Sequence, residues 1–166
     1  MSSTSSNVPE ATVAAMSSRR AEPFDVLLVE DDPTDRDRIR NAFGQLPVEL
    51  TFTVVTDGET ALEELSVRVA DKSTELPALV LLDLDLPGVN GHALLETIRE
   101  DASLVRLPVI VLTSSGTGED VQRSYELSAN AYLTKPAEPD AFYSLAEAVA
   151  EFWFEHVLLP PISGPR

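Results

Sequence analysis

The chain of 166 residues contains no cysteine, which excludes disulfide bonds and thiol chemistry. Basic residues are also scarce, because 12 Lys and Arg stand against 28 Asp and Glu, giving a formal net charge of −16. A surplus of negative charge of this size repels polyanions, and it argues against nonspecific binding to nucleic acid or to an anionic membrane surface. The composition therefore favours a protein or a cation as the binding partner.

Long hydrophobic runs are absent as well. No apolar segment approaches the length that crosses a bilayer, and the first seven residues lack both the positive charge and the apolar stretch of a secretory signal. The missing cysteines agree with a reducing compartment. These absences predict a soluble, cytoplasmic protein.

The chain divides into three parts by composition. Residues 1–22 are rich in Ser and Ala and nearly free of large apolar side chains, so we expect a disordered N-terminal arm. Residues 23–155 are long enough to bury the core of one domain. Residues 156–166 remain as a C-terminal arm.

Strand and helix patterns alternate five times within the domain. Continuous apolar runs such as residues 78–82 are typical of strands covered on both faces, whereas residues 48–54 alternate as a half-exposed edge strand does. Asp32 and Asp57 stand where helix N-caps are expected. The last helix is predicted from about residue 139, with its core-facing stripe formed by Phe142, Leu145, Val149 and Phe152. Right-handed crossovers then give an α/β fold, a parallel sheet between helices.

Four of the predicted strands end in side chains that can do chemistry. Glu30 and Asp31 follow residues 26–29, Asp83 follows residues 78–82, Thr113 ends the run that starts at Val109, and Lys135 follows the strand from Ala131. Each one alone has an ordinary explanation, as a solvated acid, a strand-end hydroxyl or a surface lysine. The carboxyl ends of parallel strands share one edge of the sheet, so the joint occurrence favours a single site there. Carboxylates this close repel one another, and a divalent cation such as Mg²⁺ removes that repulsion.

The set of residues, in this order and spacing, resembles the receiver domain of two-component response regulators over roughly residues 24–155. The resemblance implies a flavodoxin-like fold, a five-stranded parallel sheet of order 2-1-3-4-5 flanked by five helices. It implies Asp83 as phosphoacceptor and Mg²⁺ as cofactor, with Mn²⁺ as the alternative ion. The implied metal ligands are Glu30, Asp31, Asp83 and the backbone carbonyl of Asp85; the implied phosphate-binding and switch residues are Thr113, Ser114, Tyr132 and Lys135, with a cis peptide bond before Pro136.

The function implied by this resemblance is signalling. Asp83 would accept a phosphoryl group from a histidine kinase in a Mg²⁺-dependent reaction, and the face of the fourth helix, fifth strand and fifth helix would pass the signal to other proteins. Such a protein catalyses only its own phosphorylation and dephosphorylation. One alternative is a haloacid-dehalogenase-type phosphatase, because Asp83-Leu84-Asp85 resembles its Asp-x-Asp motif, although Pro87 stands where those enzymes usually have Thr or Val. A phosphoryl sink or shuttle without output of its own is a further alternative.

The C-terminal segment carries more apolar side chains than one helix face needs. Together with Leu28-Val29-Glu30-Asp31-Asp32-Pro33, it resembles the small receivers paired with phytochrome-type histidine kinases, which implies a kinase of that type as partner. The surplus predicts a homodimer, or else a tail that folds back over its own domain. The residues expected at the dimer contact are Phe152, Trp153, Phe154, Leu158 and Leu159.

Overall fold

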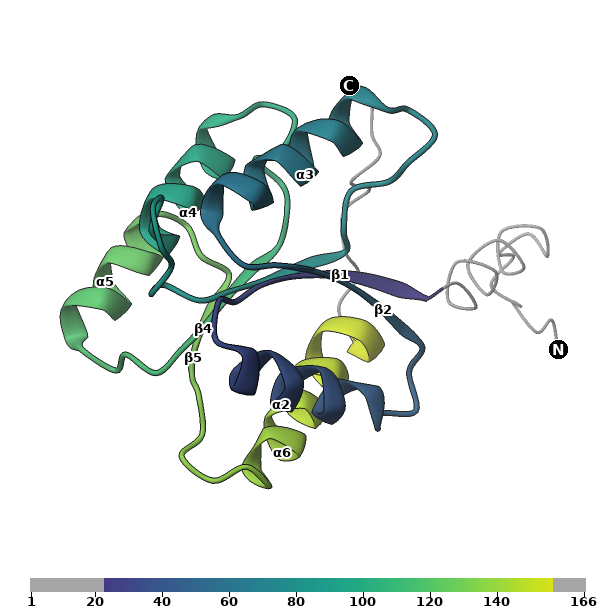
Figure 1. The fold of residues 1–166 in the computed structure, drawn as a ribbon, viewed down its shortest axis with the longest axis vertical. Coiled ribbons are helices and arrows are strands. Elements are labelled where there is room, and N and C mark those ends of the chain that lie inside the picture. The colour runs from purple at the N-terminus through teal and green to yellow at the C-terminus, as the bar shows by residue number, and fades with distance from the viewer. Residues whose placement is uncertain (1–22, 157–166) are drawn as a thin grey trace, which may run out of the picture.

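The computed structural model describes residues 23–156, in which a parallel sheet lies between two layers of helices (Figure 1). The strands are β1 (Phe24–Val29), β2 (Leu50–Val55), β3 (Leu79–Leu82), β4 (Val109–Thr113) and β5 (Ala131–Thr134). Their order in the sheet is β2-β1-β3-β4-β5, and every neighbouring pair is parallel. The predicted fold class and strand order are confirmed.

Within residues 23–156, five α-helices and one π-helical turn connect and follow the strands. They are α2 (Pro33–Gly44), α3 (Gly58–Ala70), α4 (Gly91–Glu100), α5 (Gly118–Glu126), α6 (Ala141–Ala150) and the turn η1 (Glu151–His156). The two predicted N-caps are confirmed, because Asp32 accepts a hydrogen bond from the N–H of Thr34 at 2.9 Å and Asp57 accepts one from the N–H of Thr60 at 2.7 Å. Within residues 23–156, no helix is both long enough and apolar enough to cross a bilayer.

The sheet buries one hydrophobic core on each of its faces. Along β3, Leu79 and Leu81 join the core under α2 and α6, while Val80 and Leu82 join the core under α3 and α4. Successive side chains of a strand point to opposite faces, so a strand covered on both sides must be apolar at every position. Burial of each such side chain stabilises the fold by roughly 1.5–3 kcal/mol. The uninterrupted apolar run before Asp83 follows from this double burial.

Helix α6 faces the core with a different stripe from the one predicted. Phe142 and Val149 are buried as expected, but Ala146 and Ala150 complete the buried face, and Leu145 is only half-buried. Phe152, predicted on the core stripe, is 59% exposed, whereas Trp153 packs against the core under α2 and α6. Small alanines on the inner face are compatible with the contact that α6 makes with α2. The helix also changes from α-helical to π-helical geometry at η1, just before Phe152, which alters the direction of the side chains that follow. The core position predicted for Phe152 is therefore wrong.

Candidate functional site

Backbone hydrogen bonds between neighbouring strands continue to the carboxyl ends of the strands and fix their register there. The N–H of Glu30 donates to the carbonyl of Val55 at 3.0 Å, and the N–H of Asp83 donates to the carbonyl of Val29 at 3.1 Å. At the other side of the site, the N–H of Lys135 donates to the carbonyl of Thr113 at 2.8 Å. The residue that follows each strand is thus fixed at the carboxyl edge of the sheet, where the predicted site was expected.

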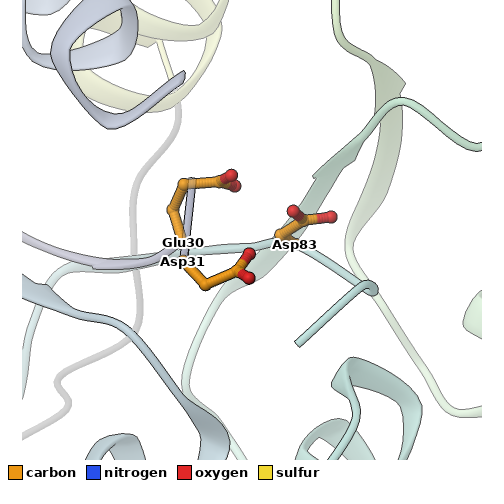
Figure 2. A group of neighbouring side chains, drawn as sticks. All are labelled: Glu30, Asp31 and Asp83. Carbon is orange, nitrogen blue, oxygen red and sulfur yellow. The ribbon is translucent and has the colours of Figure 1, made fainter. Parts of the chain in front are cut away.

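Three carboxylates lie together beyond the ends of β1 and β3 (Figure 2). Glu30, Asp31 and Asp83 each offer one oxygen, and these oxygens lie within 4.8 Å of one another. Glu30 and Asp83 are buried, whereas Asp31 is exposed, so the group is accessible to solvent from the Asp31 side. Hard divalent cations such as Mg²⁺ and Mn²⁺ prefer carboxylate oxygens, so this donor set fits the predicted cofactor.

Lys135 brings an ammonium group into contact with two members of this acidic group, Glu30 and Asp83. Its side chain is 5% exposed, and Nζ lies 2.9 Å from Glu30 Oε2, 2.9 Å from Asp35 Oδ2 and 3.1 Å from Asp83 Oδ2. Burial alone would lower the pKa of Lys135, but hydrogen bonds to Asp35 and Glu30 outweigh burial and raise that pKa above its usual value. Lys135 is therefore a fixed positive charge within hydrogen-bonding distance of the Asp83 carboxylate.

The same surroundings favour the neutral form of Glu30, whereas they favour the charged form of Lys135. Burial raises the pKa of its carboxyl group from 4.5 to about 8, and the negative charge of Asp83 adds to this effect, while Lys135 opposes it. Without a bound cation, Glu30 thus holds a proton at neutral pH. A divalent cation beside this carboxyl group would favour its ionised form.

Thr113 and Asp85 donate hydrogen bonds to one oxygen of the Asp83 carboxylate, and Lys135 contacts the other oxygen. The buried hydroxyl of Thr113 donates to Asp83 Oδ1 at 2.8 Å, and the N–H of Asp85 donates to the same oxygen at 3.2 Å. The side chain of Asp85 is exposed. Asp83 Oδ1 therefore meets neutral donors while Oδ2 meets the ammonium, so the carboxylate has one preferred orientation.

Tyr132 fixes the loop that follows β4. Its hydroxyl donates to the carbonyl of Ser115 at 2.5 Å, and the hydroxyl of Ser115 donates to the carboxylate of Asp120 at the start of α5. Ser114, predicted beside the phosphate-binding residues, is exposed at the beginning of this loop. Thr113 and Tyr132 thus lie on neighbouring strands, one bonded to Asp83 and the other to the loop before α5.

Two residues of the site were not predicted from the sequence. Asp35, in the first turn of α2, is the third partner of Lys135, and a carboxylate in the first turn of a helix has an ordinary explanation in the helix dipole. Gly91 lies against the backbone of the phosphoacceptor candidate, because a Cβ atom there would come within 2.5 Å of the Asp83 carbonyl oxygen and 2.6 Å of Leu84 Cα. A glycine directly after the N-cap Asn90 was the only sequence signal for this contact.

The peptide bond before Pro136 is trans, because the described part of the chain contains no cis peptide bond. The predicted cis bond is therefore wrong. For a prolyl bond the two isomers differ by only about 0.5–1 kcal/mol, so sequence gives little information on which one is present. Lys135 reaches the acidic cluster with this bond trans.

The predicted dimer contact falls only partly within the described residues. Phe152 is exposed, and its ring meets that of Trp153 edge-to-face with centroids 5.5 Å apart. The side chain of Phe154, together with Leu158 and Leu159, lies outside the part of the chain that the structure describes.

Comparisons with known proteins agree with this geometry. A family model described as the response regulator receiver domain matches residues 26–147. Response regulator Rcp1 of Synechocystis is 34% identical over 145 residues, which span 87% of this chain and 99% of Rcp1. A crystal structure of Rcp1 in its Mn²⁺-bound form superimposes with a TM-score of 0.75, covering 83% of this chain and 99% of that one.

Two further solved structures are regulators named for phytochromes. The phosphorylated cyanobacterial phytochrome response regulator RcpA is 34% identical, with a TM-score of 0.77 over 84% of this chain and 99% of that chain. The bacteriophytochrome response regulator RtBRR is 37% identical, with a TM-score of 0.66 over 86% of this chain and 87% of that chain. With its sheet order, its strand-end residues and these similarities, the chain belongs to the response regulator receiver domain family.

Proposed function

We propose that this protein receives a phosphoryl group from a sensor histidine kinase on Asp83 and transmits the event by protein contacts. The observation that carries the proposal is the environment of Asp83, a buried carboxylate bonded to Lys135 through one oxygen and to Thr113 through the other. The phosphorylated form in which RcpA was solved supports it. Family membership argues against the alternative of a haloacid-dehalogenase-type phosphatase, and so does the exposed side chain of Asp85.

The transfer itself is a displacement at phosphorus. A carboxylate oxygen of Asp83 forms a bond to the phosphorus atom, the P–N bond of the kinase phosphohistidine breaks, and its electron pair leaves on an imidazole that carries a proton on its other nitrogen. Lys135 and Thr113 are placed to donate hydrogen bonds to the phosphoryl oxygens as charge accumulates there. Glu30, Asp31, Asp83 and the backbone carbonyl of Asp85 would hold Mg²⁺ or Mn²⁺, which supplies further positive charge when it is bound.

We assign the output to the face formed by α5, β5 and α6 (Figure 1). If Thr113 turns from Asp83 toward a phosphoryl oxygen, the space around Tyr132 changes, and Tyr132 is bonded to the loop that leads into α5. A local charge event at Asp83 can thereby alter this surface. A phosphoryl sink or shuttle would undergo the same phosphorylation, but no partner protein would bind the face formed by α5, β5 and α6.

We further propose a phytochrome-type kinase as the phosphoryl donor, a cytoplasmic location and a homodimer. The regulators similar to this chain that carry phytochrome in their names support the first of these. The exposed Phe152 next to Trp153 supports a contact between two copies, as does the apolar pair Leu158 and Leu159 further along the sequence. Truncation after Glu155 combined with Phe152→Ala, which removes an exposed ring and leaves the core contact of Trp153 intact, should convert a dimer to a monomer in sedimentation equilibrium. A wild-type protein that stays monomeric at high micromolar concentration contradicts the dimer.

Intact-mass spectrometry tests the phosphoacceptor directly. After incubation with Mg²⁺ and acetyl phosphate, the wild type should gain one phosphoryl group and Asp83→Asn none. Asp85→Asn is the matched control, because it removes a carboxylate two residues away that is exposed, and it should still gain the group. A gain by Asp83→Asn equal to that of the wild type contradicts the assignment. Turnover of a small phosphomonoester would instead support the phosphatase.

A further inference from the structure

Lys135 has three N–H donors and, among the described residues, three carboxyl groups as partners. The ammonium lies 2.9 Å from Glu30, 2.9 Å from Asp35 and 3.1 Å from Asp83, so each donor can meet one carboxylate. Glu30 and Asp83 belong to the acidic group that fits a divalent cation, whereas Asp35 does not. Asp35 is therefore the one partner of Lys135, among these three, that neither a cation nor a phosphoryl group on Asp83 takes away.

Asp35 is held in place by the start of α2 rather than by the site. The helix begins after the N-cap Asp32, with Pro33 at its first position, and Asp35 lies in the first turn. Ile39 and Phe43 anchor the same helix in the core. The helix dipole favours a negative charge in this turn, and the first turn of α2 places the Asp35 carboxylate 2.9 Å from the Lys135 ammonium. Its side chain is 20% exposed, so most of the carboxylate is shielded from water.

We propose that Asp35 is a positioning residue, which keeps Lys135 pointed into the site when Glu30 and Asp83 are engaged elsewhere. The inference rests on the proposed phosphorylation of Asp83. Without Asp35, the flexible lysine side chain would lose its remaining carboxylate partner in the loaded site and would spend more time in solvent. Phosphoryl transfer would then slow down, although the group that fits the cation would be intact.

The first test measures how firmly Lys135 is held, and it does not require phosphorylation. The chain contains two lysines, Lys72 and Lys135, and Lys72 is exposed, so it is an internal reference for labelling with an amine-reactive reagent. Loss of one charge-assisted hydrogen bond should raise the labelling rate of Lys135 relative to Lys72 about fivefold in Asp35→Asn with saturating Mg²⁺. Asp37→Asn is the control, because Asp37 is exposed two residues further along the same helix, and it should leave the ratio unchanged. Equal labelling in Asp35→Asn and the wild type overturns the proposal.

The second test measures the reaction. With acetyl phosphate and Mg²⁺, the rate constant for phosphorylation should fall about tenfold in Asp35→Asn, stay unchanged in Asp37→Asn and be largely restored in Asp35→Glu, which keeps the charge. The Mg²⁺ affinity from calorimetry should stay within about threefold of the wild type, because Asp35 lies outside the cation-binding group.

A structural defect and a positioning defect are separated by a double-mutant cycle. In a Lys135→Met background, Asp35→Asn should change the rate less than about twofold, because the residue through which Asp35 acts is gone. An undiminished effect in that background overturns the proposal. If the wild type and Asp37→Asn gain no phosphoryl group at all, the proposed function fails, and the labelling of Lys135 still decides whether Asp35 holds it.

Discussion

Glu30 should make the metal-free protein lose stability as the pH rises. The pKa of its carboxyl group is raised from 4.5 to about 8 because the side chain is buried next to Asp83. Between these two values the folded protein holds a proton on Glu30 that the unfolded chain has released. Unfolding then releases a proton, and the free energy of unfolding decreases with increasing pH throughout this interval.

The size of the effect follows from the same two pKa values. One proton released on unfolding corresponds to a slope of roughly 1.4 kcal/mol per pH unit, so the loss from pH 5 to pH 7 is about 2.5 kcal/mol, because the unfolded carboxyl group is still partly protonated near pH 5. The decrease should level off above the folded-state pKa of about 8. Lys135 adds no slope in this range, because its pKa is raised above 10.5 and it is protonated in both states.

Urea denaturation in the presence of a chelator measures this slope. Trp153 is the single tryptophan of the chain and packs against the core under α2 and α6, so its fluorescence reports unfolding. Glu30→Gln, which is neutral at every pH, should be nearly flat over the same range and more stable than the wild type at pH 7. Saturating Mg²⁺ should stabilise the wild type more at pH 7 than at pH 5, because it binds the ionised carboxylates. A wild-type stability that rises with pH, or an equal slope in Glu30→Gln, refutes the reasoning.

Three other substitutions probe the packing around the site by chemical denaturation. Gly91→Ala should cost about 2 kcal/mol, because its Cβ atom would overlap the backbone at Asp83, whereas Gly118→Ala meets nothing within 4 Å and should be neutral. Thr113→Val should lower stability by about 1 kcal/mol by leaving Asp83 Oδ1 one donor short, yet intact-mass measurements should still find the phosphoryl group on Asp83. Arg99→Ala should cost about 3 kcal/mol, because Arg99 donates to three backbone carbonyls and one amide oxygen in the described structure; a loss below 1 kcal/mol contradicts this role.

The sheet and most of the site could be predicted because each depends on local sequence. A strand covered on both faces is apolar at every position, so β1, β3 and β4 stand out as continuous runs. The residue after such a run lies at the carboxyl edge by geometry alone, which predicts the places of Glu30 and Asp83, and Lys135 follows the edge strand β5 at the same edge. Capping is equally local, and Asp32 and Asp57 were predicted for that reason.

The errors concern features that depend on how elements pack. Helix α6 offers two apolar stripes, one through Leu145 and Phe152 and one through Ala146 and Ala150, and periodicity favours the larger side chains. The structure buries the alanines, and the hydrophobic pattern of one helix alone could not indicate that choice. The isomer of the bond before Pro136 was likewise not determined by local sequence.

Asp35 shows most clearly why part of a site escapes sequence reasoning. It is 100 residues from Lys135 in the chain, and its place in the first turn of α2 already has a sufficient local explanation. Its second role, as a partner of Lys135, depends on the tertiary fold, which places the start of α2 next to the end of β5. Glu30, Asp35 and Asp83 then surround a single ammonium, and Asp31 lies beside Glu30 and Asp83, so in the cation-free site Lys135 and a proton on Glu30 offset only part of the negative charge. A site in this state is destabilised by its own charges, and a cation that relieves the repulsion is the ligand this arrangement favours.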